Sequence, residues 1–248
     1  VYFFGPGCAD GSAAMRDVLG GKGAGLAEMA NLGLPVPPGL TMSAKLCLTY
    51  IEQGSFSDAV RDEVGRNLKA LERATKKKFG DPQNPRLVAV RSGAAVSMPG
   101  MMESILNLGL NDATVQGLAT RTGNPRFAWD CYRRFVTMFG DVVLSIPRKT
   151  FDDQLDAVKT RLRLTADSEL PANELQKLTE TGKDVVAERT GQAFPQDPRE
   201  QLRLAIDAVF DSWCAKKAGD YRRIHGIPED WGTAVTVMAM VFGNLGET

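Results

Sequence analysis

A glycine-rich stretch around one lysine, Val18-Leu-Gly-Gly-Lys-Gly-Ala-Gly-Leu-Ala-Glu-Met29, constrains the fold of this chain more than any other segment. Four glycines fall within six residues there, and because glycine has no Cβ, the backbone can approach a ligand closely and adopt positive φ. A helical pattern over residues 22–32 follows directly. A helix that begins at this point would direct free N–H groups at a bound group. The lysine is then a candidate phosphate-binding cation, and a turn with a solvated lysine is the alternative.

Two common phosphate-binding loops do not match this stretch. The P-loop pattern fails because Gly21-Lys22 is followed by Gly23 where serine or threonine is required. The dinucleotide fingerprint G-x-G-x-x-G fails because the sixth residue counted from Gly21 is Leu26. A phosphate bound here would therefore belong to another class of nucleotide-binding site.

Composition and charge exclude several classes of function. The chain has 248 residues, enough for one large domain or two small ones. Lys and Arg total 30, as do Asp and Glu, so the net charge of zero favours neither nucleic acid nor an acidic membrane surface as a partner. The longest apolar-rich run, residues 235–242, is too short to span a bilayer, and residues 1–4 lack the pattern of a signal peptide. We therefore expect a cytoplasmic protein that binds neither nucleic acid nor membrane.

Cysteine and histidine usage narrows the chemistry further. The four cysteines (Cys8, Cys47, Cys131 and Cys214) form no C-x-x-C pair, which is typical of free thiols in a reducing compartment and not of a zinc site. The single histidine, His225, excludes a multi-histidine metal site and argues against a histidine-dependent hydrolase. Its sequence context predicts a turn after a helix, where a basic residue is favourable. No metal-ligating residue is predicted in this chain.

Proline and glycine divide the first part of the chain into short elements. Three prolines exclude helix from residues 34–40. Thr41 or Ser43 is expected to cap a helix over residues 43–53. The spacing of apolar residues predicts a longer helix over residues 56–79, whose basic end is expected to be a solvated last turn.

A basic residue at the end of a predicted strand is the second candidate ligand contact. Residues 87–91 have the composition of a short buried strand that ends at Arg91. The carboxyl end of a strand, before a loop of small residues, is a usual place for a ligand contact. Another strand is predicted over residues 104–110. The intervening loop contains Pro99-Gly100 and several methionines, which predicts a mobile flap; core filling by the methionines is the alternative.

From Asp112 onward the pattern is mostly helical. Apolar residues repeat at spacings of three and four, so helices are expected over residues 112–121, 125–144, 151–163, 171–190 and 198–217. Residues 235–242 return to a strand pattern. We therefore predict an α+β fold with a first nucleotide-binding part over 1–111, a mostly helical subdomain over 112–217, and a return to the first part over 218–248. Because the chain stops soon after a buried type of strand, we expect it to be truncated.

Six segments together are similar to a known family. They are Gly20-Gly-Lys-Gly-Ala-Gly-Leu-Ala-Glu-Met29, Gly33-Leu-Pro-Val-Pro-Pro-Gly39, Val90-Arg-Ser-Gly-Ala94, Ser97-Met-Pro-Gly-Met-Met-Glu-Ser-Ile-Leu-Asn-Leu-Gly109, Asn124-Pro-Arg-Phe-Ala-Trp-Asp-Cys-Tyr-Arg-Arg-Phe135 and Met240-Val-Phe-Gly-Asn-Leu-Gly246. In this order and spacing they resemble the start of pyruvate, phosphate dikinase. The related phosphoenolpyruvate synthase family is less similar at the Met-Pro-Gly-Met-Met stretch and at Gly5-Pro-Gly-Cys-Ala9.

The resemblance implies an ATP-grasp nucleotide-binding domain, present here in part. In that family ATP phosphorylates a histidine of a swivelling domain, which carries the phosphoryl group to a pyruvate-binding barrel. ATP, phosphate and pyruvate thereby give AMP, pyrophosphate and phosphoenolpyruvate, with magnesium. Neither of those two domains is matched here, and the magnesium-binding carboxylates are expected beyond Thr248. The resemblance thus implies ATP and Mg²⁺ as cofactors, a homodimeric parent that also contains the phosphohistidine and pyruvate-binding domains, and no turnover by this chain alone.

The resemblance also assigns residues. Lys22 matches the family's loop lysine and Arg91 its strand-end arginine, so both are expected to hold ATP phosphates during phosphoryl transfer. That reaction depends on positioning and charge neutralisation more than on covalent chemistry by the protein. The other nucleotide-binding residues implied are glycines and a methionine of the two loops and three residues of an adenine pocket: Gly21, Gly23, Gly93, Gly100, Met101, Met240, Val241 and Phe242.

Two other interpretations stay open. A phosphoenolpyruvate synthase-like dikinase would use water where the first family uses phosphate. A non-catalytic nucleotide-binding module would be full length, with a self-contained site. The unfinished strand and loop at the end of the chain argue against the module.

Overall fold

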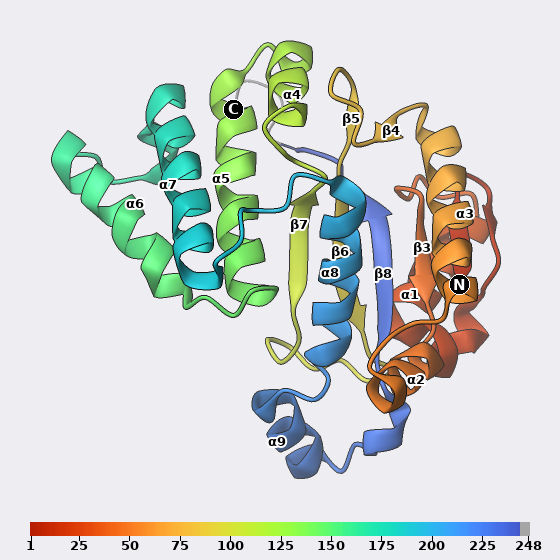
Figure 1. Ribbon diagram of the computed structural model, residues 1–248. Helices are drawn as coiled ribbons and strands as arrows, with labels where there is room; N and C mark the ends of the chain where they lie inside the picture. The colour runs from red at the N-terminus through yellow and green to blue at the C-terminus, as the bar shows by residue number, and fades with distance from the viewer. Residues whose placement is uncertain (244–248) are drawn as a thin grey trace. The chain divides into compact units, whose positions relative to one another are not determined.

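An antiparallel sheet organises the first of two compact units. The computed structural model describes residues 1–243, and its first unit comprises Val1–Lys77, Val88–Ser104 and Ala205–Val241. The strand order in this unit is β2-β1-β3-β8-β6 (Figure 1). The strands are β1 Tyr2–Gly5, β2 Cys8–Ala9, β3 Gly39–Met42, β6 Val88–Gly93 and β8 Ala234–Ala239. All of these neighbours pair antiparallel, and the predicted α+β class is confirmed.

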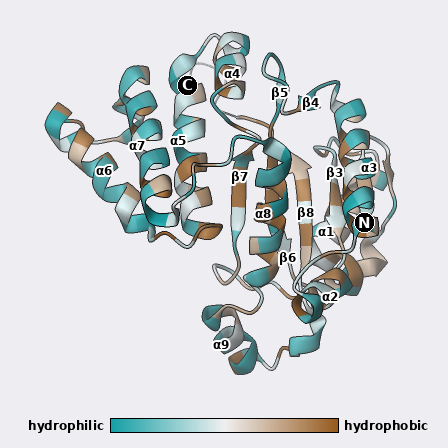
Figure 2. Ribbon diagram, viewed as in Figure 1, coloured by the Kyte–Doolittle hydropathy of each residue, from teal (hydrophilic) through white to brown (hydrophobic). Residues whose placement is uncertain are grey.

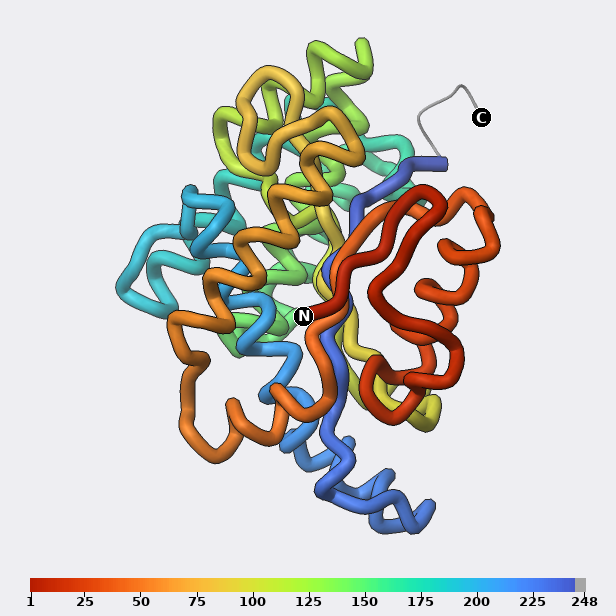
Figure 3. Tube along the Cα trace, turned by 90° about the vertical axis from the view of Figure 1, so that its right-hand side faces the viewer, coloured from red at the N-terminus to blue at the C-terminus, as the bar shows by residue number. Residues whose placement is uncertain are grey.

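Helices cover both faces of this sheet. The helices α1 Arg16–Asn31 and α3 Asp58–Thr75 lie on opposite sides of the strands (Figure 3). Leu40, Val237 and Val90 are paired across the three central strands, so they point to one face of the sheet, where they are fully buried. Figure 2 shows these strands in the hydrophobic colour and the outer helix surfaces in the hydrophilic one. Burial against helices on both sides explains why most residues of these strands are buried.

Two of the predicted helix boundaries in this unit need correction. The helix expected over residues 43–53 is α2 Ala44–Gln53, but Ser43 makes no capping hydrogen bond with its side chain, and Thr41 lies in β3. The helix expected over residues 56–79 ends as α3 at Thr75. There Lys76 adopts a left-handed conformation with φ 53°, which ends the helix before the basic run is complete. A short 3₁₀ helix, Ala13–Met15, precedes α1.

The strand predictions hold with shifted ends. The strand expected over 87–91 continues as β6 to Gly93, and the one over 104–110 is β7 Ser104–Leu108. The last strand, expected over 235–242, is β8, which ends at Ala239, so Met240–Phe242 are not part of it. Strands β1, β2 and β3 were not predicted, because each is short and next to glycine or proline.

Helices form most of the second unit, which comprises Lys78–Leu87, Ile105–Leu204 and the residues from Phe242. Its helices are α4 Thr114–Thr122, α5 Pro125–Val142, α6 Arg148–Leu162 and α7 Ala172–Thr190, with a 3₁₀ helix at Asp167–Glu169. A two-stranded parallel pair, β4 Lys78–Phe79 and β5 Pro85–Arg86, belongs to it as well. The four helices predicted over 112–190 therefore form, with ends shifted by a few residues.

Aromatic rings fill the core of this helical unit. Phe135 and Phe139 on α5 both contact Phe194, with ring centroids 5.7 and 5.4 Å apart, in the edge-on arrangement that aromatic quadrupoles favour. Two glycines, Gly140 on α5 and Gly182 on α7, lie against the ring of Phe151. A Cβ on Gly140 would lie 2.4 Å from that ring, so the glycine is required for this close approach.

The final predicted helix, over residues 198–217, divides into two. Helix α8 spans Pro198–Asp211, α9 spans Lys216–His225, and the 3₁₀ helix Glu229–Trp231 follows. Trp213 lies in the break, where its indole donates to the Glu229 carbonyl at 3.1 Å. The guanidinium of Arg222 covers its ring at 4.1 Å and donates to its carbonyl at 2.6 Å. These contacts between residues far apart in the sequence end α8 at Asp211, although the spacing of apolar residues predicts a helix as far as residue 217.

Within residues 1–243, no helix is both long and apolar enough to cross a membrane. The domain boundaries predicted at 111/112 and 217/218 stay predictions.

Candidate functional site

A kink at Gly20 positions the predicted lysine. Gly20 lies within α1 but has φ 68° and ψ 169°, so the helix restarts at Gly21. A Cβ on Gly20 would lie 1.6 Å from the carbonyl oxygen of Gly93. The amide of Gly21 donates to the Ala94 carbonyl at 3.0 Å. The glycine-rich stretch is therefore not a loop before a helix, as expected, but a break inside one, held against the end of β6.

Lys22 extends from this break toward the same strand. Its ammonium donates to the carbonyl of Ser92 at 2.8 Å. Partial burial of the ammonium and, second, the positive charge of Arg91 both lower the pKa of Lys22 below its ordinary value. The two predicted cations are thus near enough to repel each other. An ammonium has three donors, so the bond to Ser92 leaves donors for a bound anion.

Arg91 lies inside β6 and not at its end. It is the exposed residue of an otherwise buried strand. Its cross-strand partner on β8 is Thr236, whose own partner on β3 is Thr41. Residues directly opposite one another point to the same face of a sheet. A polar row, which we define as Thr41, Thr236 and Arg91, therefore crosses three adjacent strands on one face.

The polar row lies on the face that α1 covers. A Cβ on Gly23 would lie 2.9 Å from the Thr41 side chain, so this glycine allows α1 to pass close over the sheet. The hydroxyls of Thr41 and Thr236 are buried and 3.3 Å apart. The structure thus brings Gly21, Lys22, Gly23 and Arg91 together. The sequence analysis missed both threonines of the row, although the alternation of Thr236 with the valines of β8 was a usable signal.

The loop after β6 carries the other predicted glycine and methionine. The amide of Gly93 donates to the buried hydroxyl of Thr233 at 3.3 Å, which holds the start of the loop. At its tip, Met101 donates its amide to the Met98 carbonyl at 3.2 Å, across a turn in which Gly100 has φ 72°. The Met98 side chain is buried and anchors the loop, as the core-filling alternative for the methionines predicts.

An ion pair holds the end of that loop. Glu103 forms an ion pair with Lys217, near the start of α9. Both side chains are partly exposed, so this pair adds little to stability, but it connects the end of the loop to the body of the first unit. Gly100 and Met101 therefore lie on a segment held at both ends and exposed at its tip.

The three residues predicted for an adenine pocket follow the end of β8. Met240 is half-buried and Val241 is exposed, and both belong to the first unit. Phe242 belongs to the second unit, where its ring meets that of Phe127 edge-on with centroids 5.1 Å apart. At about 3.3 Å per residue, the last residue of β8, Ala239, lies about 10 Å along the strand from Thr236, and Met240 follows it.

The charges at this site differ from those of a metal centre. Within residues 1–243, no group of three or more His, Cys, Asp or Glu side chains is arranged to hold a metal ion. The donors at the site are cations, backbone amides and hydroxyls, which suit an anion. We assign no Mg²⁺ ligand among the described residues.

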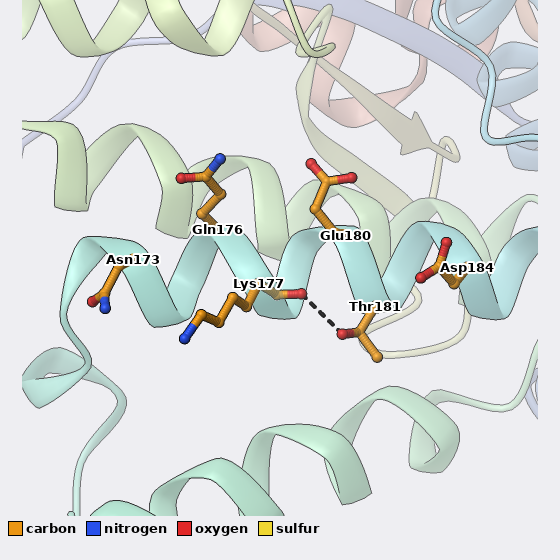
Figure 4. A pocket seen from close by; sticks show the side chains of 6 residues that line it. All are labelled: Asn173, Gln176, Lys177, Glu180, Thr181 and Asp184. Carbon is orange, nitrogen blue, oxygen red and sulfur yellow. Dashed lines mark hydrogen bonds between the residues drawn. The ribbon is translucent and has the colours of Figure 1, made fainter.

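A second polar surface lies on α7 in the helical unit. Figure 4 shows Asn173, Gln176, Lys177, Glu180, Thr181 and Asp184 projecting from its open face. Its charges are compensated locally, because Lys177 pairs with Glu174 and Glu180 with Lys183. We interpret this surface as a solvated helix face.

Comparison with known proteins relates the whole chain to one family. The family profile described as "Pyruvate phosphate dikinase, AMP/ATP-binding domain" matches residues 16–77 and 51–246. The chain is 52% identical over 249 residues to "Pyruvate, phosphate dikinase" of Rhizobium meliloti (strain 1021), and 52% identical over 250 residues to that of Giardia intestinalis. It is 50% identical over 248 residues to "Pyruvate, phosphate dikinase 2" of Oryza sativa subsp. japonica. Each alignment covers 100% of this chain but 28% of the relative.

Proposed function

Because the chain belongs to the pyruvate phosphate dikinase AMP/ATP-binding domain family, we propose that it binds ATP at the break in α1. Lys22 and Arg91 hold the phosphates, with Gly21 and Gly23 allowing close approach of the backbone. Gly93, Gly100 and Met101 contribute from the loop after β6. The observation that carries the proposal is the convergence of Lys22 and Arg91 on the carbonyl end of β6, where each is near the other's charge.

We propose that the adenine lies at the carboxyl end of β8, beyond Ala239. Met240 and Val241 follow β8 in the sequence. The length of strand between them and the polar row suits a nucleoside triphosphate that lies along β8. Apolar side chains at a strand end suit a purine. Phe242 is included in this pocket on the resemblance alone.

The chemistry asked of these residues is electrostatic. Phosphoryl transfer develops charge on the transferred group and on the leaving oxygen, and fixed cations stabilise that charge without reorganisation. Lys22 acts as a point charge, and Arg91 can bind two phosphate oxygens with one planar group. Mg²⁺, when bound with ATP, supplies further charge neutralisation; no residue of this chain is assigned to it.

In the whole protein, we propose the dikinase reaction that the relatives' names indicate. ATP would phosphorylate a histidine of a separate domain, and a third domain would convert pyruvate to phosphoenolpyruvate. Both domains are partners that this chain requires for turnover. The relatives' names favour this reaction over the phosphoenolpyruvate synthase-like alternative. A homodimeric, cytoplasmic parent completes the proposal.

Calorimetric titration of Mg-ATP into this chain tests the site. We expect binding that is weakened about tenfold or more in Lys22→Ala and in Arg91→Ala, since each removes a charge-assisted contact. The matched controls are Lys69→Ala and Arg66→Ala, two exposed positions on α3 across the sheet, which should bind as the unmodified chain does. Equal affinity in all five proteins, with folding intact by circular dichroism, would contradict the assignment.

A chimaera tests the reaction. This chain would replace the homologous segment of a full-length relative, and AMP, pyrophosphate and phosphoenolpyruvate would be measured with ATP, phosphate and pyruvate supplied. We expect activity that Lys22→Ala abolishes and that consumes phosphate. Activity that proceeds without added phosphate would instead support the synthase-like alternative.

A further inference from the structure

Arg16, the first residue of α1, lies beside the proposed phosphate site. Its side chain folds back over the kink. From the point where a Cβ of Gly21 would lie, Nη2 of Arg16 is 3.4 Å away and Nε is 3.5 Å away. The carbonyl oxygen of Ala94 is 3.7 Å from the same point. The guanidinium and the loop after β6 thus meet at one glycine.

No carboxylate of the described residues forms an ion pair with the Arg16 guanidinium. In the part of the chain that the structure describes, the side chain of Arg16 takes part in no hydrogen bond or ion pair. Some arginines of this chain are paired, namely Arg133 with Asp130, Arg203 with Glu200 and Arg223 with Asp220, and others, Arg66 on α3 among them, are not. Arg16 is exposed, and an exposed guanidinium without a protein partner is available to an anion that binds later.

Three cations therefore lie near the Gly20 kink and the end of β6. Arg16 and Lys22 lie on either side of the Gly20 kink, and Arg91 extends from β6. No described acidic side chain forms an ion pair with any of them. Such an excess of one charge raises the local concentration of anions of opposite sign. A guanidinium adds what the ammonium of Lys22 cannot, a planar fork of donors that matches two phosphate oxygens.

We propose that Arg16 is a third phosphate-binding residue, which contacts the phosphate chain of the nucleotide where α1 restarts at Gly21. This inference rests on the proposed function of the same site. The ligand class is a polyphosphate chain, with or without the nucleoside.

The test separates the phosphate chain from the base. Inorganic tripolyphosphate, ATP and adenosine would each be titrated into the unmodified chain, Arg16→Ala and Arg16→Lys. We expect Arg16→Ala to weaken tripolyphosphate and ATP about tenfold, as loss of a charge-assisted contact does, and to leave adenosine unchanged. Arg16→Lys should recover only part of the loss. Arg66→Ala, which also removes one exposed positive charge, should change none of the three affinities by more than about twofold.

The outcomes distinguish the two proposals. If Lys22→Ala and Arg91→Ala weaken tripolyphosphate binding but Arg16→Ala does not, the role of Arg16 is refuted and the site stands. If tripolyphosphate does not bind, or no variant affects it, the site and the role of Arg16 both fail. Equal losses for tripolyphosphate and adenosine in Arg16→Ala would indicate a disturbed fold and would overturn the phosphate contact. Thermal melting of each variant checks that the fold is retained.

Discussion

Two places in this chain, one in each unit, use charge in different ways. In the helical unit, Arg133 is buried and paired with both Asp130 and Asp167, and Glu174 is buried and paired with Lys177. In the sheet unit, Arg91 is exposed without an ion pair, and Lys22 is held by a backbone carbonyl. Paired charges fix helices in place, whereas unpaired cations that converge on one loop leave an anion site. Local compensation of charge therefore separates the scaffold of this chain from its candidate site.

The largest effect should come from Gly20, where the site depends on backbone geometry. Alanine there would have to adopt φ 68° and ψ 169°, a conformation nearly restricted to glycine, with its Cβ 1.6 Å from the Gly93 carbonyl. We expect Gly20→Ala to lower the free energy of unfolding by about 3 kcal/mol or more. Urea denaturation followed by circular dichroism measures it.

Gly25, in the same helix, is the matched control. A Cβ there would meet nothing within 4 Å, so Gly25→Ala should raise stability by about 0.5–1 kcal/mol through helix propensity. If the two substitutions had similar effects, the kink at Gly20 would not be a structural requirement of the site.

The charge comparison is tested most directly at Arg133. Arg133→Met removes the cation from a buried network and leaves Asp130 with Arg134 alone. We expect a loss of about 3 kcal/mol of stability and no change in ATP affinity. Lys22→Met should do the reverse, weakening ATP with little loss of stability. A single variant that changed both quantities strongly would break the distinction between scaffold charges and site charges.

Each unit also contains one buried cysteine whose thiol loses its proton only at high pH. Burial raises the pKa of Cys47, in the sheet unit, and that of Cys131, in the helical unit, to about 12. Because unfolding would return each thiol to about 8.5, the stability they contribute is present below that pH and is lost as pH rises from 9 toward 12. We expect a loss of roughly 2 kcal/mol per thiol at pH 10.

Alanine substitution at each thiol separates the two contributions. Cys47→Ala and Cys131→Ala should each flatten the alkaline fall in stability, measured by denaturant titration from pH 8 to 10. Exposed Cys8 is the control, and Cys8→Ala should leave the fall unchanged. Equal slopes in all four proteins would mean that neither thiol is protected as the burial indicates.

The smallest effect should come from the polar row. Thr236→Val leaves the buried hydroxyl of Thr41 without its partner at 3.3 Å, for an expected loss of about 1 kcal/mol. Replacing both threonines by valine should recover part of that loss, because both polar groups are then removed. A double-mutant cycle by thermal denaturation gives the coupling. Additive losses would show that the two hydroxyls act independently.

Local pattern predicted much of the helical unit. Helices α4 to α7 have their apolar residues on one face, and Asn124 with Pro125 marks the start of α5, where the Asn124 side chain accepts from the Phe127 amide at 2.9 Å. The pattern failed at α8, because the break there comes from the contacts of Trp213 with Arg222 and Glu229. Those residues meet only after folding, so no local window contains the signal.

By itself the sequence determined the α+β class, the predicted helices of the helical unit, the strand that carries Arg91 and the importance of the glycine-rich stretch. These features depend on glycine content and apolar spacing, which act within a few residues. Tertiary structure decided that the stretch is a kink and not a loop, because Gly93 lies against Gly20 from a strand about seventy residues away. It likewise placed Thr41, Thr236 and Arg91 in one row, since the register of β3, β8 and β6 joins residues that no spacing along the chain connects. Cross-strand pairing joins residues that are far apart in the sequence. The entropy lost in closing the intervening loops is offset only by the packing of the whole sheet.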